Sequence, residues 1–209
     1  MHADFWHERW SNNQIGFHES AVNPLLVTHC AELGLSPSAR LFLPLCGKTL
    51  DIDWLLAQGH RVVGAELSPL AVAQLFERLE MAPVVERAGE MQRWRTADLD
   101  VFVGDFFALS AAALGPVDAV YDRAAMIALP PEMRRRYVAH MDALVHSVPQ
   151  LLVTLEYEQE CMPGPPFAVM DAEVLGSHGR REPRLLASHE VPGGLKGRCP
   201  AREKVWLLP

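Results

Sequence analysis

Residues 41–69 read LFLPLCGKTLDIDWLLAQGHRVVGAELSP, and this stretch decides the fold. Its two apolar runs, 41–45 and 61–66, are short and rich in Leu and Val, as buried strands are. Residues 49–58 between them have the composition of a helix, and Gly59 follows as its stop. A strand, a helix and a second strand in succession predict a parallel α/β unit.

The same alternation continues along the chain. Helix starts are marked by a capping residue before proline at Asn23-Pro24 and Ser68-Pro69, and by Pro131. The further runs with strand composition are 92–95, 100–103, 117–121, 151–157, 185–191 and 203–208, of which the last two suit an antiparallel pair. Because no internal repeat or linker interrupts the chain, residues 1–209 are expected to form one domain on a doubly wound sheet of roughly six or seven strands.

The composition is that of an ordinary globular protein: 209 residues, of which 49% are hydrophobic and 22% charged. The 19 basic and 26 acidic side chains give a net charge of −7, and no basic stripe of the kind that binds nucleic acid is present. No apolar stretch approaches the ~20 residues of a membrane-spanning helix, and the opening MHADFWHERW lacks the apolar segment of a secretion signal. We therefore expect no nucleic-acid or membrane partner.

The cysteines and histidines are scattered. The four cysteines, at 30, 46, 161 and 199, form no CxxC pair, which favours a reduced, cytoplasmic protein over a disulfide-bonded secreted one. The nine histidines do not cluster at metal-ligand spacing, so no metal site is predicted.

The loop after the first predicted strand contains one glycine, Gly47. Gly47-Lys48-Thr49 resembles the end of a phosphate-binding loop, but the earlier glycine that such a loop needs would fall at Phe42, inside the strand. This argues against a nucleoside triphosphatase. A dinucleotide site is weakened but not excluded, because a pyrophosphate must approach several backbone amides closely.

Glu66 ends the second predicted strand about 20 residues after that loop, where an acidic side chain binds the ribose hydroxyls of an adenosine. A nucleoside cofactor without a pyrophosphate needs this acid but not three glycines, and S-adenosylmethionine is such a cofactor. Asp105 and Phe106 follow another strand and suit hydrogen bonding and stacking to an adenine. The competing structural interpretations are a capping acid at Glu66 and a turn followed by a core phenylalanine at Phe106.

Two further features are an arginine near the end of a predicted strand and an aromatic segment before the first strand. Arg123 comes directly after Asp122 near the end of strand 117–121, where it would stabilise negative charge on a substrate or form a structural pair with Asp122. Residues 1–34 read as a helical lid over a cofactor, or as a helix that packs its aromatic side chains into the core. The aromatic residues of this segment are Phe5, Trp6, Trp10 and Phe17.

Several motifs in a fixed order resemble one known family. They are Phe5-Trp6-x-x-Arg9-Trp10, Ile15-Gly16-Phe17-His18, Pro44-Leu45-Cys46-Gly47-Lys48, Gly64-x-Glu66-Leu67-Ser68, Gly104-Asp105-Phe106-Phe107, Tyr121-Asp122-Arg123-Ala124 and Gly164-Pro165-Pro166-Phe167. Together they are similar to the thiopurine S-methyltransferase family in the short form of its bacterial branch. The similarity runs from about residue 5 to 174, whereas residues 176–202 match poorly.

The resemblance implies an α/β class I methyltransferase fold, with a seven-stranded, mostly parallel sheet of order 3-2-1-4-5-7-6 whose strand seven is antiparallel. It implies S-adenosylmethionine as methyl donor and an aromatic or heterocyclic thiol, such as a thiopurine, as acceptor. A detoxifying role toward selenium or tellurium compounds is a further expectation. Carried over by position, Trp10, Leu45, Glu66 and Arg123 contact the cofactor, with Phe106 added from its place after a strand, and Phe17 and Pro166 face the acceptor.

Methyl transfer to a thiolate requires alignment of two sulfur atoms rather than a strong base. We therefore assign Arg123 an electrostatic and orienting role, expect Asp122 to orient Arg123, and assign no general base. Two other functions stay open from the residues alone, a nucleotide-linked oxidoreductase and a non-enzymatic module that binds the cofactor. Because no exposed apolar stripe is evident, we expect a monomer.

Overall fold

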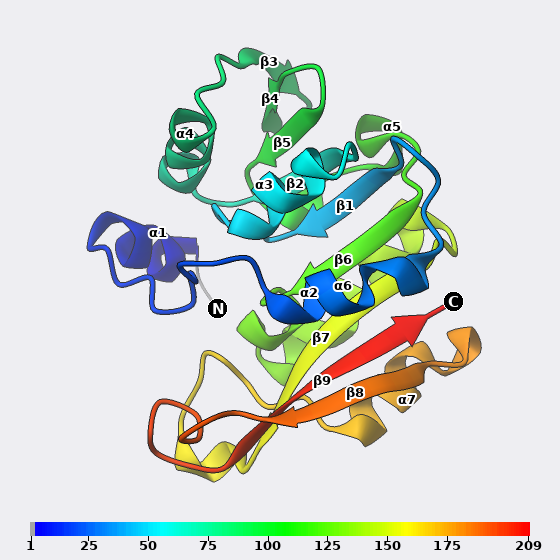
Figure 1. Cartoon of the computed structure of the whole chain (residues 1–209). Helices are drawn as coiled ribbons and strands as arrows, with labels where there is room; N and C mark the ends of the chain where they lie inside the picture. The colour runs from blue at the N-terminus through cyan, green and yellow to red at the C-terminus, as the bar shows by residue number, and fades with distance from the viewer. Residues whose placement is uncertain (1–2) are drawn as a thin grey trace.

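The computed structural model describes residues 3–209, and a nine-stranded mixed sheet runs through them (Figure 1). The strands are β1 (Arg40–Pro44), β2 (Arg61–Glu66), β3 (Val84–Ala88), β4 (Met91–Arg95), β5 (Leu99–Val103), β6 (Ala119–Arg123), β7 (Gln150–Tyr157), β8 (Arg184–Glu190) and β9 (Ala201–Leu208). They lie in the order β3-β4-β5-β2-β1-β6-β7-β9-β8. The predicted α/β class is confirmed.

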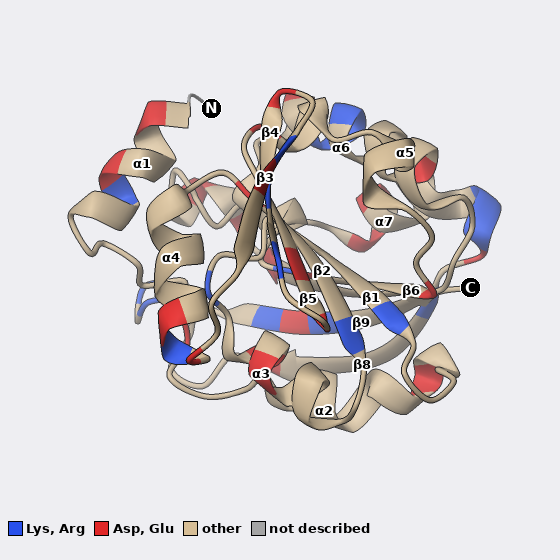
Figure 2. Ribbon diagram, turned by 90° about the horizontal axis from the view of Figure 1, so that it is seen from above, with Lys and Arg blue, Asp and Glu red and all other residues tan. Residues whose placement is uncertain are grey.

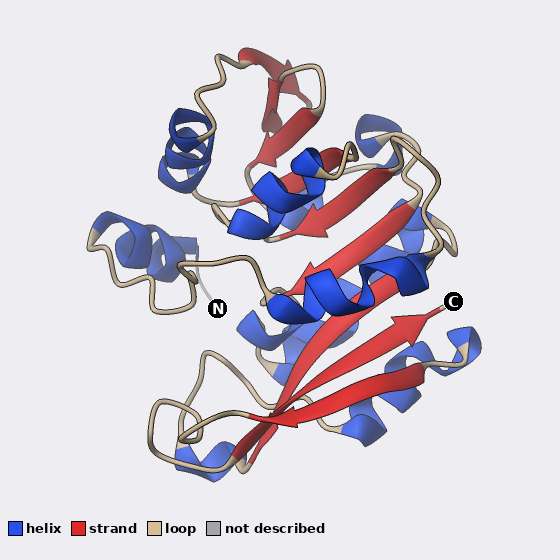
Figure 3. Ribbon diagram, in the orientation of Figure 1, coloured by secondary structure: helices blue, strands red, loops and turns tan. Residues whose placement is uncertain are grey.

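The predicted number of seven strands is wrong. β3 and β4 form an antiparallel hairpin that extends the sheet beyond β5 (Figure 3). Without this hairpin the order is β5-β2-β1-β6-β7-β9-β8, with β9 antiparallel to both of its neighbours. β3 lacks the continuous apolar run of a buried strand because it lies at the sheet edge, where Val84 and Val85 are 67% and 50% exposed.

Helices cover both faces of the sheet (Figure 2). One face carries α2 (Pro24–His29), α3 (Leu50–Ala57) and α4 (Pro69–Arg78), and the other carries α5 (Ala111–Leu114), α6 (Pro131–Val145) and α7 (Asp171–His178). Short 3₁₀ turns occur at Cys30–Leu33, Phe106–Ala108, Met126–Ala128, Gln159–Cys161 and Gly179–Arg181. Each layer buries its own apolar cluster against the sheet, which is the arrangement of a doubly wound fold.

The helix starts follow the capping residues in the sequence. The side chains of Asn23, Thr49 and Ser68 each accept a hydrogen bond from a backbone N–H in the first turn that follows. Gly34 ends the turn that extends α2, with a left-handed φ of 62°.

The parallel pairing brings four strand ends to one edge of the sheet. β1 is parallel to β2 and β6, and β2 is parallel to β5, so that Pro44, Glu66, Val103 and Arg123 end their strands on the same side. α1 (Ala3–Ser11) lies beyond this edge (Figure 1). Within residues 3–209, no helix combines the length and apolar character needed to cross a bilayer.

Candidate functional site

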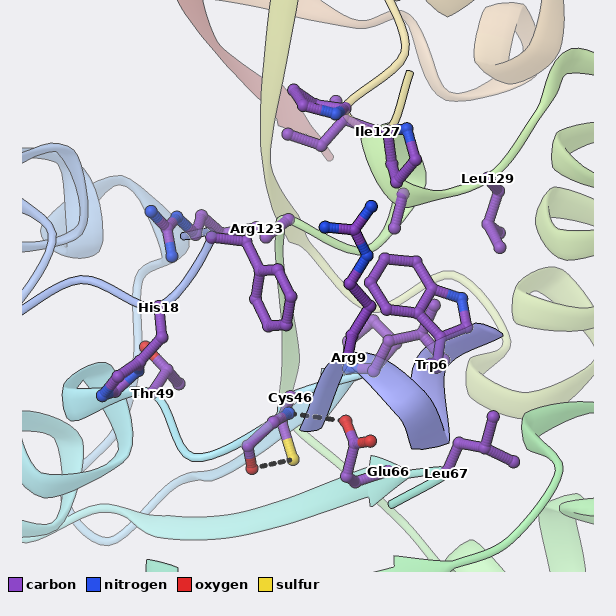
Figure 4. Close-up of a pocket in the computed structure, with 18 of the residues that line it drawn as sticks. Trp6, Arg9, His18, Cys46, Thr49, Glu66, Leu67, Arg123, Ile127 and Leu129 are labelled. Atoms are coloured by element: carbon purple, nitrogen blue, oxygen red, sulfur yellow. Dashed lines mark hydrogen bonds between the residues drawn. The ribbon is translucent and has the colours of Figure 1, made fainter. Parts of the chain in front are cut away.

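A pocket of about 610 Å³ lies at these strand ends, within the usual range for small-molecule sites. All seven residues predicted for the site line it: Trp10, Phe17, Leu45, Glu66, Phe106, Arg123 and Pro166. They come from six separate segments of the chain, which the fold brings together. In Figure 4, Trp6 and Arg9 project from α1 into the same pocket as Glu66 and Arg123.

Glu66 is buried, at 6% exposure, and ends β2 at the pocket wall. Its Oε2 accepts a hydrogen bond from the Gly47 N–H at 2.7 Å, and its Oε1 accepts one from the Ser68 N–H at 2.8 Å. Burial raises the pKa of Glu66, and these backbone hydrogen bonds oppose the shift. Because a carboxylate has about four acceptor positions, two are left for the hydroxyls of a ribose. The side chain therefore fixes the adjoining loop and keeps acceptor positions free at the pocket wall.

The loop after β1 has an unusual backbone, and its Gly47 amide points at Glu66. Leu45 and Gly47 have positive φ values of 47° and 55°, a backbone conformation that is uncommon for a non-glycine residue such as Leu45. A Cβ on Gly47 would lie 3.1 Å from a ring carbon of Trp10. This glycine is thus required both for the turn and for the close approach of the tryptophan.

Aromatic side chains from the N-terminal segment cover the loop. Trp10 is 5% exposed and packs edge-to-face against Phe17, with ring centroids 5.4 Å apart. Phe17 makes a second edge contact with Trp6, and the Lys48 ammonium lies 5.8 Å from the centroid of the Trp10 ring. These contacts place Trp10 and Phe17 at the pocket rather than in the central core.

Arg123 forms an ion pair with Glu19, which lies in the segment between α1 and α2. The prediction that Asp122 orients Arg123 is wrong. Asp122 is fully buried, and its carboxylate accepts hydrogen bonds from the Tyr137 hydroxyl at 2.6 Å and the Met126 N–H at 3.2 Å. The reason is geometric, since successive side chains on a strand point to opposite faces.

Asp122 is expected to make stability depend on pH. Burial raises its pKa from 3.8 to about 6, against the opposing hydrogen bonds from Tyr137 and Met126. Between about pH 4 and about pH 6 the unfolded state loses this proton first, so the free energy of unfolding falls as pH rises, by up to about 1.4 kcal/mol per pH unit. Above that window the contribution is constant. Urea unfolding from pH 4 to 7 should show a flatter profile for Asp122→Asn than for the wild type, and equal slopes would contradict the assignment.

Phe106 has most of its ring in the core. The ring stacks near Phe42 at 6.5 Å and packs against Tyr137 at 5.1 Å, and the residue is 4% exposed. Phe107 next to it is half-buried and carries the Arg136 guanidinium 3.8 Å above its ring. A contact of Phe106 with a cofactor stays a prediction, and the geometry favours its backbone or ring edge over a stacked ring.

Pro166 is held at the pocket by a side chain from the sheet. Its carbonyl oxygen accepts a hydrogen bond from the Tyr157 hydroxyl at 2.6 Å. The Gln159 amide donates to the same Tyr157 oxygen at 2.9 Å. This network fixes the proline-rich loop after β7 against the pocket wall.

The sequence interpretation missed three carboxylates that line the pocket, Glu19, Asp51 and Glu203. Glu19 is the partner of Arg123, but it lies 104 residues away in the sequence and has no motif to mark it. Asp51 is 1% exposed and accepts hydrogen bonds from the Asn23 N–H at 2.7 Å and the Tyr121 hydroxyl at 3.1 Å. It ties the start of α2 to β6, and its position in the first turn of α3 was the only sequence signal.

Solved structures share this fold at low sequence identity. The chain superposes with a TM-score of 0.65 on 1,6-didemethyltoxoflavin-N1-methyltransferase from Burkholderia thailandensis, solved with 1,6-didemethyltoxoflavin and S-adenosylhomocysteine bound. The two are 16% identical, and the match covers 99% of this chain and 86% of that one. Magnesium protoporphyrin IX methyltransferase from Synechocystis PCC 6803 gives a TM-score of 0.64 at 15% identity, over 99% and 98% of the two chains. The shared architecture is the Rossmann-like fold of methyltransferases.

Sequence comparison identifies the family. The chain is 51% identical to the thiopurine S-methyltransferase of Xanthobacter autotrophicus, over 100% of this chain and 99% of that protein. It is 46% identical to the thiopurine S-methyltransferase of Gluconobacter oxydans, over 98% and 93% of the two chains. The family model described as thiopurine S-methyltransferase matches residues 1–186. The chain therefore belongs to the thiopurine S-methyltransferase family.

Proposed function

We propose that this protein is an S-adenosylmethionine-dependent methyltransferase that methylates the sulfur of a small aromatic or heterocyclic thiol. The observation that carries the proposal is Glu66, a buried carboxylate with unused acceptor positions at the wall of a 610 Å³ pocket. Family membership and the methyltransferase fold support the same donor and the same reaction class.

The donor supplies a methyl group that its sulfonium charge has already activated. The chain has to hold the two reactants in line and to exclude water. We propose that Glu66 binds the ribose hydroxyls. Leu45 and the loop that begins with it would bind the rest of the donor. Trp10 and the rest of the N-terminal segment would cover the bound donor as the predicted lid 1–34. Residues 1 and 2 of that lid lie outside the described range.

Arg123 lines the pocket at the end of β6, and we assign its positive charge to the acceptor. An acceptor thiol would lose its proton to water, and the guanidinium would favour the resulting thiolate or orient it through a ring nitrogen. The thiolate electron pair forms the new sulfur–carbon bond while the old one breaks toward the donor sulfur. Phe17 and Pro166 would form the apolar walls around the acceptor ring. No residue is assigned as a general base.

Trp10 fluorescence is expected to change when S-adenosylhomocysteine binds. The Trp10 ring already lies close to Gly47 in the loop after β1, and the bound ligand would lie against the same ring. Of the five tryptophans, Trp6 and Trp10 line the pocket. Trp10→Phe should therefore remove most of the change in a fluorescence titration, and Trp6→Phe should remove less. A Trp10→Phe protein with the full wild-type signal change would rule out this role.

The finer expectations belong to the same proposal. The four cysteines are free, as expected for a protein that works in the reducing cytoplasm. We further propose that the enzyme acts as a monomer on small molecules rather than on nucleic acid, and that selenium or tellurium compounds are acceptors with a nucleophilic atom similar to sulfur.

Radiolabelled methyl transfer from S-adenosylmethionine to a panel of thiols, selenols and thiopurines tests the function directly. Product with at least one aromatic or heterocyclic thiol is expected. A thermal-shift comparison separates the alternatives, since S-adenosylhomocysteine should raise Tm whereas NADH should not. Stabilisation by NADH would indicate an oxidoreductase, and stabilisation by S-adenosylhomocysteine without turnover would indicate a binding module.

A further inference from the structure

The Arg123 guanidinium is already paired within the chain. Its Nη2 contacts Oε1 of Glu19, and both residues line the pocket. The Arg123 side chain is 13% exposed and the Glu19 side chain 45% exposed. Without an acceptor, the positive charge that the proposed function offers is therefore neutralised by the protein itself.

Apart from the ion pair with Arg123, the surroundings of Glu19 disfavour the charged form of its carboxyl. Burial raises the pKa of the Glu19 carboxyl, and Arg123 opposes the shift. The neighbouring carboxylates of Glu203 and Asp51 act in the same direction as burial. With almost half of its side chain exposed, however, Glu19 has a route to solvent if another anion takes its place on Arg123.

We propose that Glu19 determines acceptor specificity by competing with the acceptor for Arg123. An acceptor with an anionic group must displace the Glu19 carboxylate before it forms its own ion pair with the guanidinium. A thiol that is neutral when it binds does not compete with Glu19 at the binding step, and only the thiolate formed after binding meets the guanidinium. The acceptor class that Glu19 controls is thus the small anionic thiols, and this inference rests on the proposed function.

The test compares Glu19→Gln with the wild type on two acceptors. The first is 2-mercaptobenzoate, which carries a carboxylate beside its thiol, and the second is phenylmethanethiol, which is neutral at pH 7. Glutamine keeps the size of the side chain and can still accept a hydrogen bond from Arg123, but it has no charge to lose. KM for 2-mercaptobenzoate should fall about three- to tenfold. This is the range expected when binding no longer has to break the partly buried ion pair between Glu19 and Arg123. KM for phenylmethanethiol should change less than about twofold.

Glu8→Gln is the matched control. Glu8 lies on α1, is exposed, and does not line the pocket, so this variant makes the same change in net charge away from Arg123. Its KM values should equal those of the wild type. Calorimetry with S-adenosylhomocysteine should give the same affinity for all three proteins.

The outcomes separate this inference from the proposed function. If Glu19→Gln leaves both KM values unchanged, or raises KM for 2-mercaptobenzoate, competition by Glu19 is refuted while wild-type turnover still supports the methyltransferase. A rise in both KM values together with weaker S-adenosylhomocysteine binding would show that Glu19 only holds the N-terminal segment in place. This result would also refute competition by Glu19. A wild type that methylates no thiol would overturn the proposed function itself.

Discussion

Glu66→Ala is expected to weaken S-adenosylhomocysteine binding about a hundredfold, or about 3 kcal/mol. The carboxylate would lose its hydrogen bonds to the ribose hydroxyls, and those hydroxyls would be left buried without an acceptor. The Gly47 and Ser68 amides would also lose the oxygens that now accept from them at 2.7 and 2.8 Å. The loop that follows β1 would then be less well ordered for the ligand.

Titration calorimetry measures the loss of affinity, and two further variants show whether it comes from the Glu66 carboxylate itself. Glu66→Gln keeps the volume but replaces one acceptor oxygen by an amide that cannot accept, so an intermediate loss of affinity is expected. Glu77→Ala removes the same charge from an exposed position of α4 and should bind as the wild type does. Thermal unfolding of each variant separates a loss of the site from a loss of the fold. Wild-type affinity in a folded Glu66→Ala protein would remove the basis of the cofactor assignment.

Arg123→Ala is expected to lower kcat/KM for an aromatic thiol about a hundredfold. The reason is the loss of a positive charge that favours the anionic sulfur in the pocket, and removal of a comparable electrostatic donor costs enzymes about 10²- to 10³-fold. Steady-state kinetics with the acceptor varied at saturating donor measures the change. Arg123→Lys, which keeps the charge but not the planar fork, should lie between the wild type and alanine.

The ion pair with Glu19 requires one more variant. Arg123→Ala alone leaves the Glu19 carboxylate in the pocket without its partner, and this charge would itself repel an anionic acceptor. The double variant Arg123→Ala, Glu19→Gln removes that repulsion. If the arginine acts on the acceptor, the double variant should remain far below the wild type. Recovery to wild-type kcat/KM, or an unaffected single variant, would exclude the proposed role of Arg123.

The strands that lie inside the sheet were predictable from local sequence. β2 begins and ends at residues 61 and 66 as predicted, because a buried parallel strand needs a continuous apolar run and the sequence has one there. The edge strand β3 was not predicted, since its side chains face solvent and its two valines do not extend into a continuous apolar run. The hairpin that it forms with β4 changed the strand count from the expected seven to nine.

The candidate site shows the same division between local and distant information. Glu66 was found from its distance to the loop after the first strand, because a βαβ unit fixes where such an acid lies. For Phe106 the sequence left both stacking on a ligand and packing in the core open, and the ring is largely enclosed by core residues that come from other parts of the chain. The expected pairing of Asp122 with Arg123 failed because adjacent residues of a strand face opposite sides, a rule that was available from the sequence.

By itself the sequence determined the α/β class, the buried strands, the helix caps and the family motifs, since each depends on residues close together in the chain. The tertiary structure decided which charged and polar side chains meet. It joined Arg123 to Glu19, Asp122 to Tyr137 and Asp51 to Tyr121, across separations of 104, 15 and 70 residues. The physical reason is that an ion pair or a buried hydrogen bond depends on distance in space, and the order of strands in the sheet sets that distance.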